Sequence, residues 1–173
     1  MSKLSLPFMS AALAMTLVCA TAMAAHGAHD ADFANKAAAG GMAEVEMGRL
    51  ASSNGSDPNI KMFGQKMVND HSSANEQLQK AAAKDGLTLP QAPSPKQKEM
   101  ADKLGKLQGA EFDKEYAHMM VKDHEEDVAL FKKEASSGKD ATMKAFAQKA
   151  LPTLEEHLKM AQQLDGKSAS KQQ

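Results

Sequence analysis

The sequence has no tryptophan, one tyrosine and a single cysteine, Cys19. Cys19 lies in an N-terminal segment that we expect to be removed, so the mature protein should have no disulfide, thiolate metal site or cysteine nucleophile. Lipidation of Cys19 is the alternative, which Val18 disfavours because it is not a small residue. Aromatic residues are only 4% of the chain, so alanine, leucine and methionine must fill the core. β-Branched residues are sparse, which argues against a sheet.

Arginine is nearly absent, because Arg49 is the single one in the chain. Bidentate clamps on phosphate or carboxylate groups, which use the arginine guanidinium, are thereby nearly excluded. Without the N-terminal segment the chain has 20 basic and 22 acidic side chains, since Lys3 is the one charged residue in that segment. A protein that binds nucleic acid needs a basic surface, so we expect no nucleic-acid partner.

The N-terminal residues have the pattern of a secretory signal peptide. Lys3 supplies the positive charge, the stretch from Leu6 to Ala20 is apolar, and Ala22-Met23-Ala24 is a small-x-small cleavage site. We expect residues 1–24 to be the signal peptide, with cleavage after Ala24 and export to the periplasm. No other segment approaches the roughly 20 apolar residues that a membrane span needs, so no transmembrane segment is expected in the mature chain.

Amphipathic segments rich in good helix formers predict an all-α protein. The segments cover residues 31–51, 57–85, 95–135 and 140–164, and Gly105 and Gly109 interrupt the third. We expect residues 25–165 to form one domain, an antiparallel up-down four-helix bundle, and residues 166–173 to form a disordered tail. The proline-containing linker at 87–95 is interpreted as too short to carry the chain back along the whole bundle.

Each predicted helix places one metal-ligand residue type on its apolar side when drawn at 3.6 residues per turn. These residues are Glu44, His71, His124 and His157. A carboxylate is rarely buried unless it is paired, because its desolvation is costly. Three imidazoles and a carboxylate suit Zn, Cu or Fe, and the sequence does not choose among them. The alternative is that all four are ordinary core residues joined by hydrogen bonds.

The depth of these residues in the bundle is a further constraint. Counted from the first and last interhelical turns, His71 and His124 lie at similar depth, whereas Glu44 and His157 are offset in opposite directions by about 12 Å. This predicts a pair around His71 and His124, joined by one of the others, and not one ion that touches all four. An acid precedes each histidine, and we expect these acids to contact histidines on neighbouring helices.

Four stretches resemble a known family: 33–50 (FANKAAAGGMAEVEMGRL), 63–78 (FGQKMVNDHSSANEQL), 112–131 (FDKEYAHMMVKDHEEDVALF) and 151–164 (LPTLEEHLKMAQQL). The Met-Val-x-Asp-His strings at 67–71 and 120–124 are the most specific part. The stretches look like the domain of unknown function 4142 family, a ferritin-like group of exported bacterial proteins. The resemblance implies a ferritin-like bundle over nearly the whole mature chain, and it implies no activity.

Ferritin-like di-iron sites take a Glu-x-x-His motif from each of two helices. Glu115 and His118 form the one match here, and both fall off the apolar stripe, so a di-iron centre is not expected. His26 and His29 are expected to lie in a flexible, solvated N-terminus. The main hypothesis is thus a non-catalytic or weakly metal-binding envelope protein with a ferritin-like bundle. A structural or stress-related interaction protein and a redox enzyme are the alternatives, and protein partners and homo-oligomerisation stay open.

Overall fold

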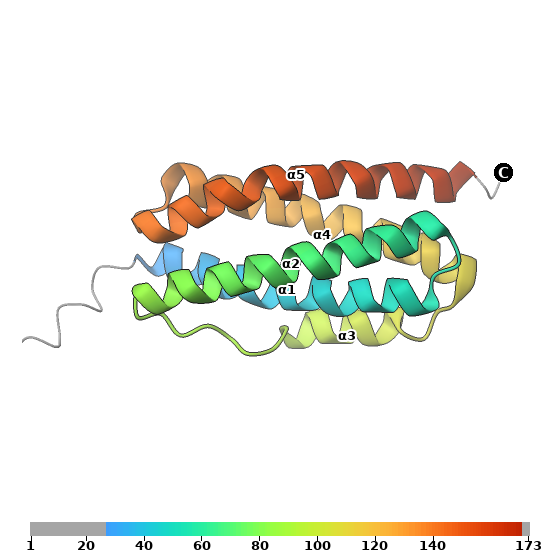
Figure 1. Cartoon of the computed structure of the whole chain (residues 1–173), viewed down its shortest axis with the longest axis horizontal. Helices are drawn as coiled ribbons and strands as arrows, with labels where there is room; N and C mark the ends of the chain where they lie inside the picture. The colour runs from blue at the N-terminus through green and yellow to red at the C-terminus, as the bar shows by residue number, and fades with distance from the viewer. Residues whose placement is uncertain (1–26, 171–173) are drawn as a thin grey trace, which may run out of the picture.

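The computed structural model describes residues 27–170, which form five α-helices and, within that range, no strand. The helices are α1 (Ala28–Asn54), α2 (Pro58–Lys84), α3 (Pro95–Leu104), α4 (Gly109–Ser137) and α5 (Ala141–Ser170), as Figure 1 shows. The prediction of an all-α protein is confirmed. The predicted signal peptide at 1–24 and its cleavage site lie outside the described residues.

Local capping explains where the helices begin. The Asp57 side chain accepts a hydrogen bond from the backbone N–H of Asn59, and Pro58 occupies the first position of α2, where its missing N–H costs nothing. Ser94 and Gln97 form a reciprocal capping box at the start of α3. These side chains satisfy N–H groups that have no partner within the helix.

One end of the molecule joins the α1–α2 turn to the start of α4. The amide of Asn54, the last residue of α1, donates hydrogen bonds to the carbonyls of Gly105 and Leu107, at 3.2 and 3.0 Å. The Asp113 carboxylate, in the first turns of α4, accepts from the backbone N–H groups of Ser56 and Asp57. The end of α1, the start of α2 and the start of α4 therefore lie together.

The opposite end joins the start of α1 to the α4–α5 turn. The Asp30 carboxylate accepts from the backbone N–H groups of Lys139 and Asp140, at 2.7 and 3.1 Å. The Thr142 hydroxyl, at the start of α5, contacts Asp85, just past the end of α2, at 3.2 Å. Hence α2 and α4 run in the same direction, while α1 and α5 run the other way (Figure 1).

This connectivity corrects the predicted simple up-down order. Residues 85–94 and α3 together carry the chain back along the molecule, so that α4 begins at the end where α2 began (Figure 1). The 27 residues of α2 span about 40 Å. A ten-residue linker extends up to about 33 Å and α3 adds about 15 Å, so the two suffice. Gly109, with a φ of +62°, provides the left-handed backbone at which α4 starts.

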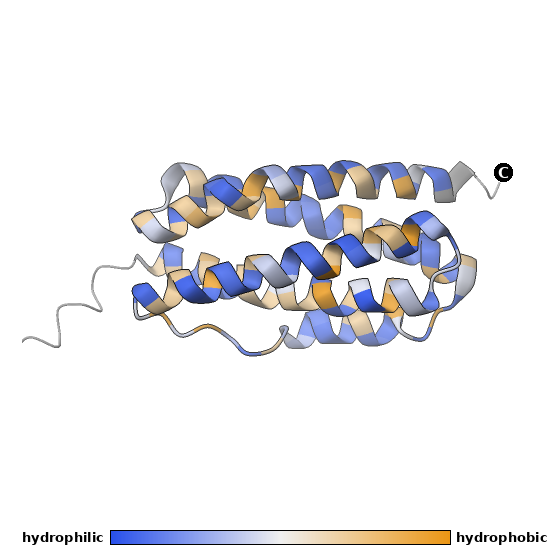
Figure 2. Cartoon of the chain, viewed as in Figure 1, coloured by the Kyte–Doolittle hydropathy of each residue, from blue (hydrophilic) through white to orange (hydrophobic). Residues whose placement is uncertain are grey.

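The helices bury their apolar sides against one another. Figure 2 shows hydrophilic positions along the outward sides of α2, α3 and α5. Helices α1 and α2 approach each other closely at their glycines, where a Cβ on Gly48 would lie 2.6 Å from the Gly64 carbonyl oxygen. Two core clusters result, one around Phe63, Phe112 and Tyr116 and another around Phe33, Phe131 and Phe146.

Helix α5 ends later in the sequence than the predicted helix at 140–164. The helix includes residues 166–170, so the predicted disordered tail at 166–173 does not begin at Gly166. One glycine inside a helix costs only about 1 kcal/mol relative to alanine, which does not end a helix by itself. Residues 171–173 lie outside the described part of the chain.

Across residues 27–170, none of the helices combines the length and the apolarity that crossing a bilayer requires.

Candidate metal centre

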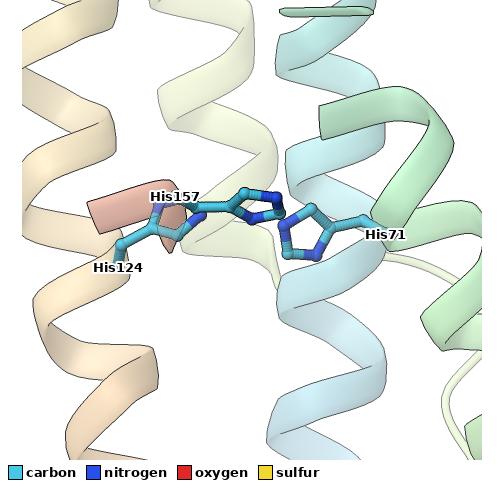
Figure 3. A group of neighbouring side chains, drawn as sticks. All are labelled: His71, His124 and His157. Carbon is cyan, nitrogen blue, oxygen red and sulfur yellow. The ribbon is translucent and has the colours of Figure 1, made fainter. Parts of the chain in front are cut away.

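The four predicted ligands come from the four long helices and meet in the middle of the molecule. Glu44 is on α1, His71 on α2, His124 on α4 and His157 on α5. Their exposed fractions are 0%, 5%, 0% and 0%, so all four are buried as the helical pattern predicts. The imidazoles of the three histidines point toward one another (Figure 3), and one ring nitrogen from each lies within 4.8 Å of the others.

The predicted offset between Glu44 and His157 is wrong. Glu44 contacts both His71 and His124. The ring centroid of His157 lies 5.3 Å from the ring centroid of His71 and 5.4 Å from that of His124. The predicted depths assume that the α1–α2 and α4–α5 turns lie at one end of the bundle. Because the crossover puts these turns at opposite ends, the two offsets have the same direction and the four side chains fall at one level.

Glu44 lies between two of the imidazoles. Its Oε2 is 2.8 Å from Nδ1 of His71, and its Oε1 is 3.4 Å from Nε2 of His124. A neutral His71 that donates from Nδ1 keeps the lone pair on Nε2, which is buried and has no hydrogen-bond partner among the described residues. Nε2 of His71 is therefore an available ligand atom.

The tautomer of His124 is determined by its backbone partner. Nδ1 of His124 lies 2.9 Å from the carbonyl oxygen of Met120, which can only accept, so Nδ1 carries the proton. The neutral ring then has its lone pair on Nε2, directed at Oε1 of Glu44. Two acceptor atoms that face each other in a buried site need a proton or a cation between them.

His157 is oriented from the other side by an acid on a neighbouring helix. Its Nε2 lies 2.8 Å from Oδ2 of Asp70, on α2, and Lys66 contacts the same oxygen at 3.0 Å. Donation from Nε2 leaves the lone pair on Nδ1, which is buried without a hydrogen-bond partner in the described chain. The expected contact between an acid and a histidine across helices is thus present for Asp70.

Burial keeps all three imidazoles neutral. Desolvation, with like-charge repulsion between the histidines, lowers the pKa of His124 to about 3, and desolvation lowers the pKa of His157 to about 4. Burial also lowers the pKa of His71. The pKa of Glu44 is raised well above its usual range by burial and by the charge of Asp123. Neutral imidazoles are the form that binds metal, and a cation would let Glu44 ionise.

A cavity of about 200 Å³ leads to the cluster between α2 and α5. Its outer lining includes the exposed Ser73 and Lys149, and its inner lining includes Glu44, His71 and His157. One wall is apolar, with the side chains of Leu78, Phe131, Phe146 and Leu154. The site is therefore buried within the bundle yet connected to the surface.

Two further acids lie beside the cluster. The prediction includes Asp123, as the acid that precedes His124, but it does not include Asp127. Asp127 lines the cavity, and burial together with Glu44 and Asp123 raises its pKa well above the usual range. Burial raises the pKa of Asp123 to about 6. Asp127 lies three residues after His124, hence on the same side of α4, and this spacing is the signal that could have identified it.

The remaining Glu-x-x-His motif lies away from the centre. Glu115 is exposed, and the side chain of His118 is 69% exposed, with Asp165 3.8 Å from its ring. Both residues therefore fall off the buried stripe of α4, as the helical pattern predicts, and they add nothing to the cluster.

Comparison with known proteins identifies a sequence family and structures with a similar fold. The family model described as a domain of unknown function, DUF4142, matches residues 16–164. No curated protein matches the sequence. A DUF305 fragment from Deinococcus radiodurans is similar in structure, with a TM-score of 0.71, 10% identity, and 82% of this chain and 98% of that chain covered. A DUF305 protein from Streptomyces coelicolor, described as a predicted secreted protein, has a TM-score of 0.69, 16% identity, and 82% and 92% covered. These similarities concern the fold.

Proposed function

We propose that this chain, which belongs to the DUF4142 family, binds one transition-metal ion through His71, His124 and His157, with Glu44 as the fourth ligand. The observation that carries the proposal is the orientation of the ligand atoms. One ring nitrogen from each of three buried imidazoles lies within 4.8 Å of the others, and the Glu44 carboxylate contacts the imidazoles of His71 and His124. Buried acceptors that converge without a donor among them are best satisfied by a cation.

The distances support a small ion of low coordination number. Ligands bound at about 2.0–2.1 Å to a tetrahedral ion lie about 3.4 Å apart. Nε2 of His124 and Oε1 of Glu44 are separated by 3.4 Å. The three ring nitrogens are within 4.8 Å, so small side-chain rotations complete the site. Three imidazoles and one carboxylate suit Zn, Cu or Fe.

The setting that we propose for this site is a ferritin-like four-helix bundle in the periplasm. A single crossover between the second and third long helices is typical of ferritin-like folds, and α3 with the preceding linker supplies one here. Export is supported by the signal-peptide pattern of residues 1–24. In this proposal the protein is a metal carrier or a metal-stabilised envelope protein. Its centre holds a single ion, because one carboxylate among the ligands does not build a di-iron centre.

A structural role without metal is the second candidate, and the 2.8 Å contact between Glu44 and His71 favours it. In that case Glu44 keeps a proton, which it shares with Nε2 of His124, and the cluster only joins α1, α2 and α4. The two candidates differ in their response to metal, because a ligand that binds the native state alone adds to the free energy of unfolding.

Titration of the metal-free protein with Co²⁺ separates these candidates. We expect the visible absorption bands of four-coordinate Co²⁺ to saturate, and His71→Ala and His124→Ala to abolish these bands. Glu44→Gln should change their position and weaken binding, because it removes the anionic ligand. His118→Ala, at an exposed histidine of α4, is the matched control and should leave the titration unchanged. A folded wild-type protein without such bands would contradict the metal proposal.

A further inference from the structure

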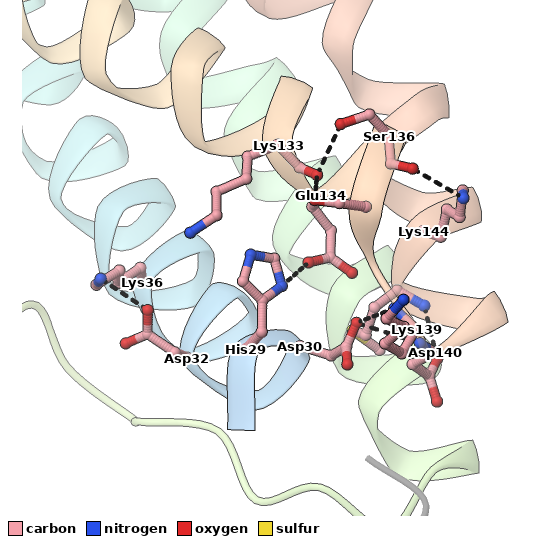
Figure 4. A network of polar contacts seen from close by, with 12 residues as sticks. His29, Asp30, Asp32, Lys36, Lys133, Glu134, Ser136, Lys139, Asp140 and Lys144 are labelled. Carbon is pink, nitrogen blue, oxygen red and sulfur yellow. Dashed lines mark hydrogen bonds and ion pairs between the residues drawn. The ribbon is translucent and has the colours of Figure 1, made fainter. Parts of the chain in front are cut away.

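A second group of ligand-type side chains lies about as far from the metal centre as the helices allow, at the end where α1 begins. His29 and Asp30 are in the first turn of α1, and Glu134 is in the last turn of α4 (Figure 4). One ligand atom from each lies within 4.8 Å of the others. His29 thus belongs to a helix and contacts an acid, which corrects the expectation of a flexible, solvated position.

Each carboxylate is buried, with 0% exposure for both Asp30 and Glu134. Oδ1 of Asp30 accepts from the backbone N–H groups of Lys139 and Asp140, at 2.7 and 3.1 Å, and this holds the carboxylate in place. Oδ2 of Asp30 and both oxygens of Glu134 are buried and accept no hydrogen bond from a described donor. Nδ1 of His29 lies 3.1 Å from Oε2 of Glu134.

The surroundings of Glu134 disfavour its negative charge. The carboxylate lies in the last turn of α4, where the helix dipole is negative, and that turn contains no basic residue. Gly138, the C-terminal cap of α4, leaves the space that Glu134 occupies, because a Cβ there would come within 2.3 Å of Oε1. Burial, a side-chain hydrogen bond with Asp30 and the charges of Asp30 and Asp140 raise the pKa of Glu134 to about 7, against the opposing charge of Lys144.

A cation fits this arrangement better than the nearby lysines do. Lys144 donates to the carbonyl oxygen of Ser136 at 3.2 Å, and Lys36 pairs with the exposed Asp32 at 2.7 Å (Figure 4). The single imidazole of His29 is 33% exposed, so solvent has access to the group from one side. Two carboxylates and one imidazole are hard or borderline ligands that suit Mn²⁺, Fe²⁺ or Zn²⁺.

We propose that His29, Asp30 and Glu134 form a second divalent-cation site, which links the first turn of α1 to the last turn of α4. The ion neutralises the two carboxylates and bridges segments that are distant in sequence. This site uses none of the residues of the central cluster, so either site can exist without the other.

The test is a Mn²⁺ titration of the ¹⁵N-labelled protein, followed by NMR, because Mn²⁺ broadens amide signals near its binding site. In the wild type we expect saturable broadening at residues 28–31 and 133–140. Glu134→Gln should abolish it, and His29→Ala should weaken Mn²⁺ binding by roughly tenfold or more, as loss of a ligand exceeds the effect of losing an outer partner. Asp32→Asn, in the same turn of α1, and Glu44→Gln should leave it unchanged.

The proposal is overturned if this broadening is absent in the folded wild type, or if it persists in both Glu134→Gln and His29→Ala. His29→Ala removes a partly exposed side chain, so it decides the matter if Glu134→Gln fails to fold. Failure of the central site would appear separately, as unchanged signals around His71 and His124.

Discussion

Oδ2 of Asp70 lies 2.8 Å from Nε2 of His157, so an acid on α2 orients a buried imidazole on α5. The contact makes Nε2 the protonated nitrogen and leaves Nδ1 directed into the histidine cluster. Lys66 holds the same Asp70 oxygen at 3.0 Å, and these two contacts lower the pKa of Asp70 against the opposing effect of burial. Asp70 is therefore ionised and positions His157 without being a ligand itself.

Replacing Asp70 should weaken metal binding without removing a ligand. For Asp70→Asn we expect a 10–100-fold loss of affinity, which is typical when an outer partner of a metal-bound histidine is changed. The measurement is competition for Zn²⁺ or Co²⁺ against a chelator of known affinity. Glu156→Gln is the control, because Glu156 directly precedes His157 yet is 59% exposed and only reaches Lys66 at 3.7 Å. Equal affinities for Asp70→Asn and the wild type would exclude the positioning role.

Glu44→Gln should change how the stability of the metal-free protein depends on pH. The folded-state pKa of Glu44 is raised above its unfolded value of about 4.5, so the native state keeps a proton that the unfolded chain releases. The free energy of unfolding of the wild type therefore falls as pH rises above about 4.5, with a contribution of at most about 1.4 kcal/mol per pH unit from this one group. Glutamine has no such proton.

The advantage of Glu44→Gln over the wild type should consequently grow between pH 5 and pH 8 in the presence of a chelator. Urea denaturation at each pH measures it, with Glu46→Gln as the control on the same helix. Saturating metal should reverse the order, because the metal-bound wild type uses the ionised carboxylate. A stability difference that does not vary with pH would show that Glu44 is ionised in the metal-free fold.

Metal should enter the centre through the cavity between α2 and α5. Ala150 lines this cavity, so Ala150→Phe should slow Co²⁺ uptake several-fold in stopped-flow absorbance while the equilibrium affinity stays near that of the wild type. Ala145→Phe places the same side chain at an exposed position of α5 that does not line the cavity, and it should not change the rate. Equal rates for all three proteins would mean that the ion enters by another route.

The close contact of α1 with α2 should tolerate no side chain at Gly48. A Cβ there would lie 2.6 Å from a backbone carbonyl oxygen of α2, which cannot move aside cheaply. We expect Gly48→Ala to lower the free energy of unfolding by about 1–3 kcal/mol, as overpacking does. Gly166→Ala has nothing within 4 Å and should be neutral or stabilising by up to about 1 kcal/mol. Thermal melting of both variants checks the prediction.

The helix faces could be predicted because 3.6-residue periodicity depends on the sequence alone. This periodicity predicts that Glu44, His71, His124 and His157 face the core, and all four are buried and close together. Their common depth could not be predicted, because it depends on the ends at which the turns lie. The predicted linker is too short by itself, but residues 85–94 and α3 together reach the far end of the bundle.

The side chains that contact these residues from other helices are harder to predict from the sequence. Asp70 contacts a histidine 87 positions away, and Glu134 meets His29 only because the crossover brings the end of α4 to the start of α1. Local patterning determines which side of a helix is apolar, whereas contacts between helices depend on connectivity and relative height. Asp127, three residues from His124 on one helix, is the one omission that periodicity could have avoided.

The central claim is that the buried histidine cluster holds a metal ion. The most direct test is elemental analysis of the untagged protein purified from its native host, alongside His71→Ala, His124→Ala and the control His118→Ala. We predict that the wild type and the control carry near-stoichiometric Zn, Cu or Fe, and that each cluster variant loses one equivalent. A wild-type protein that is metal-free and takes up none of these ions in vitro would contradict the account.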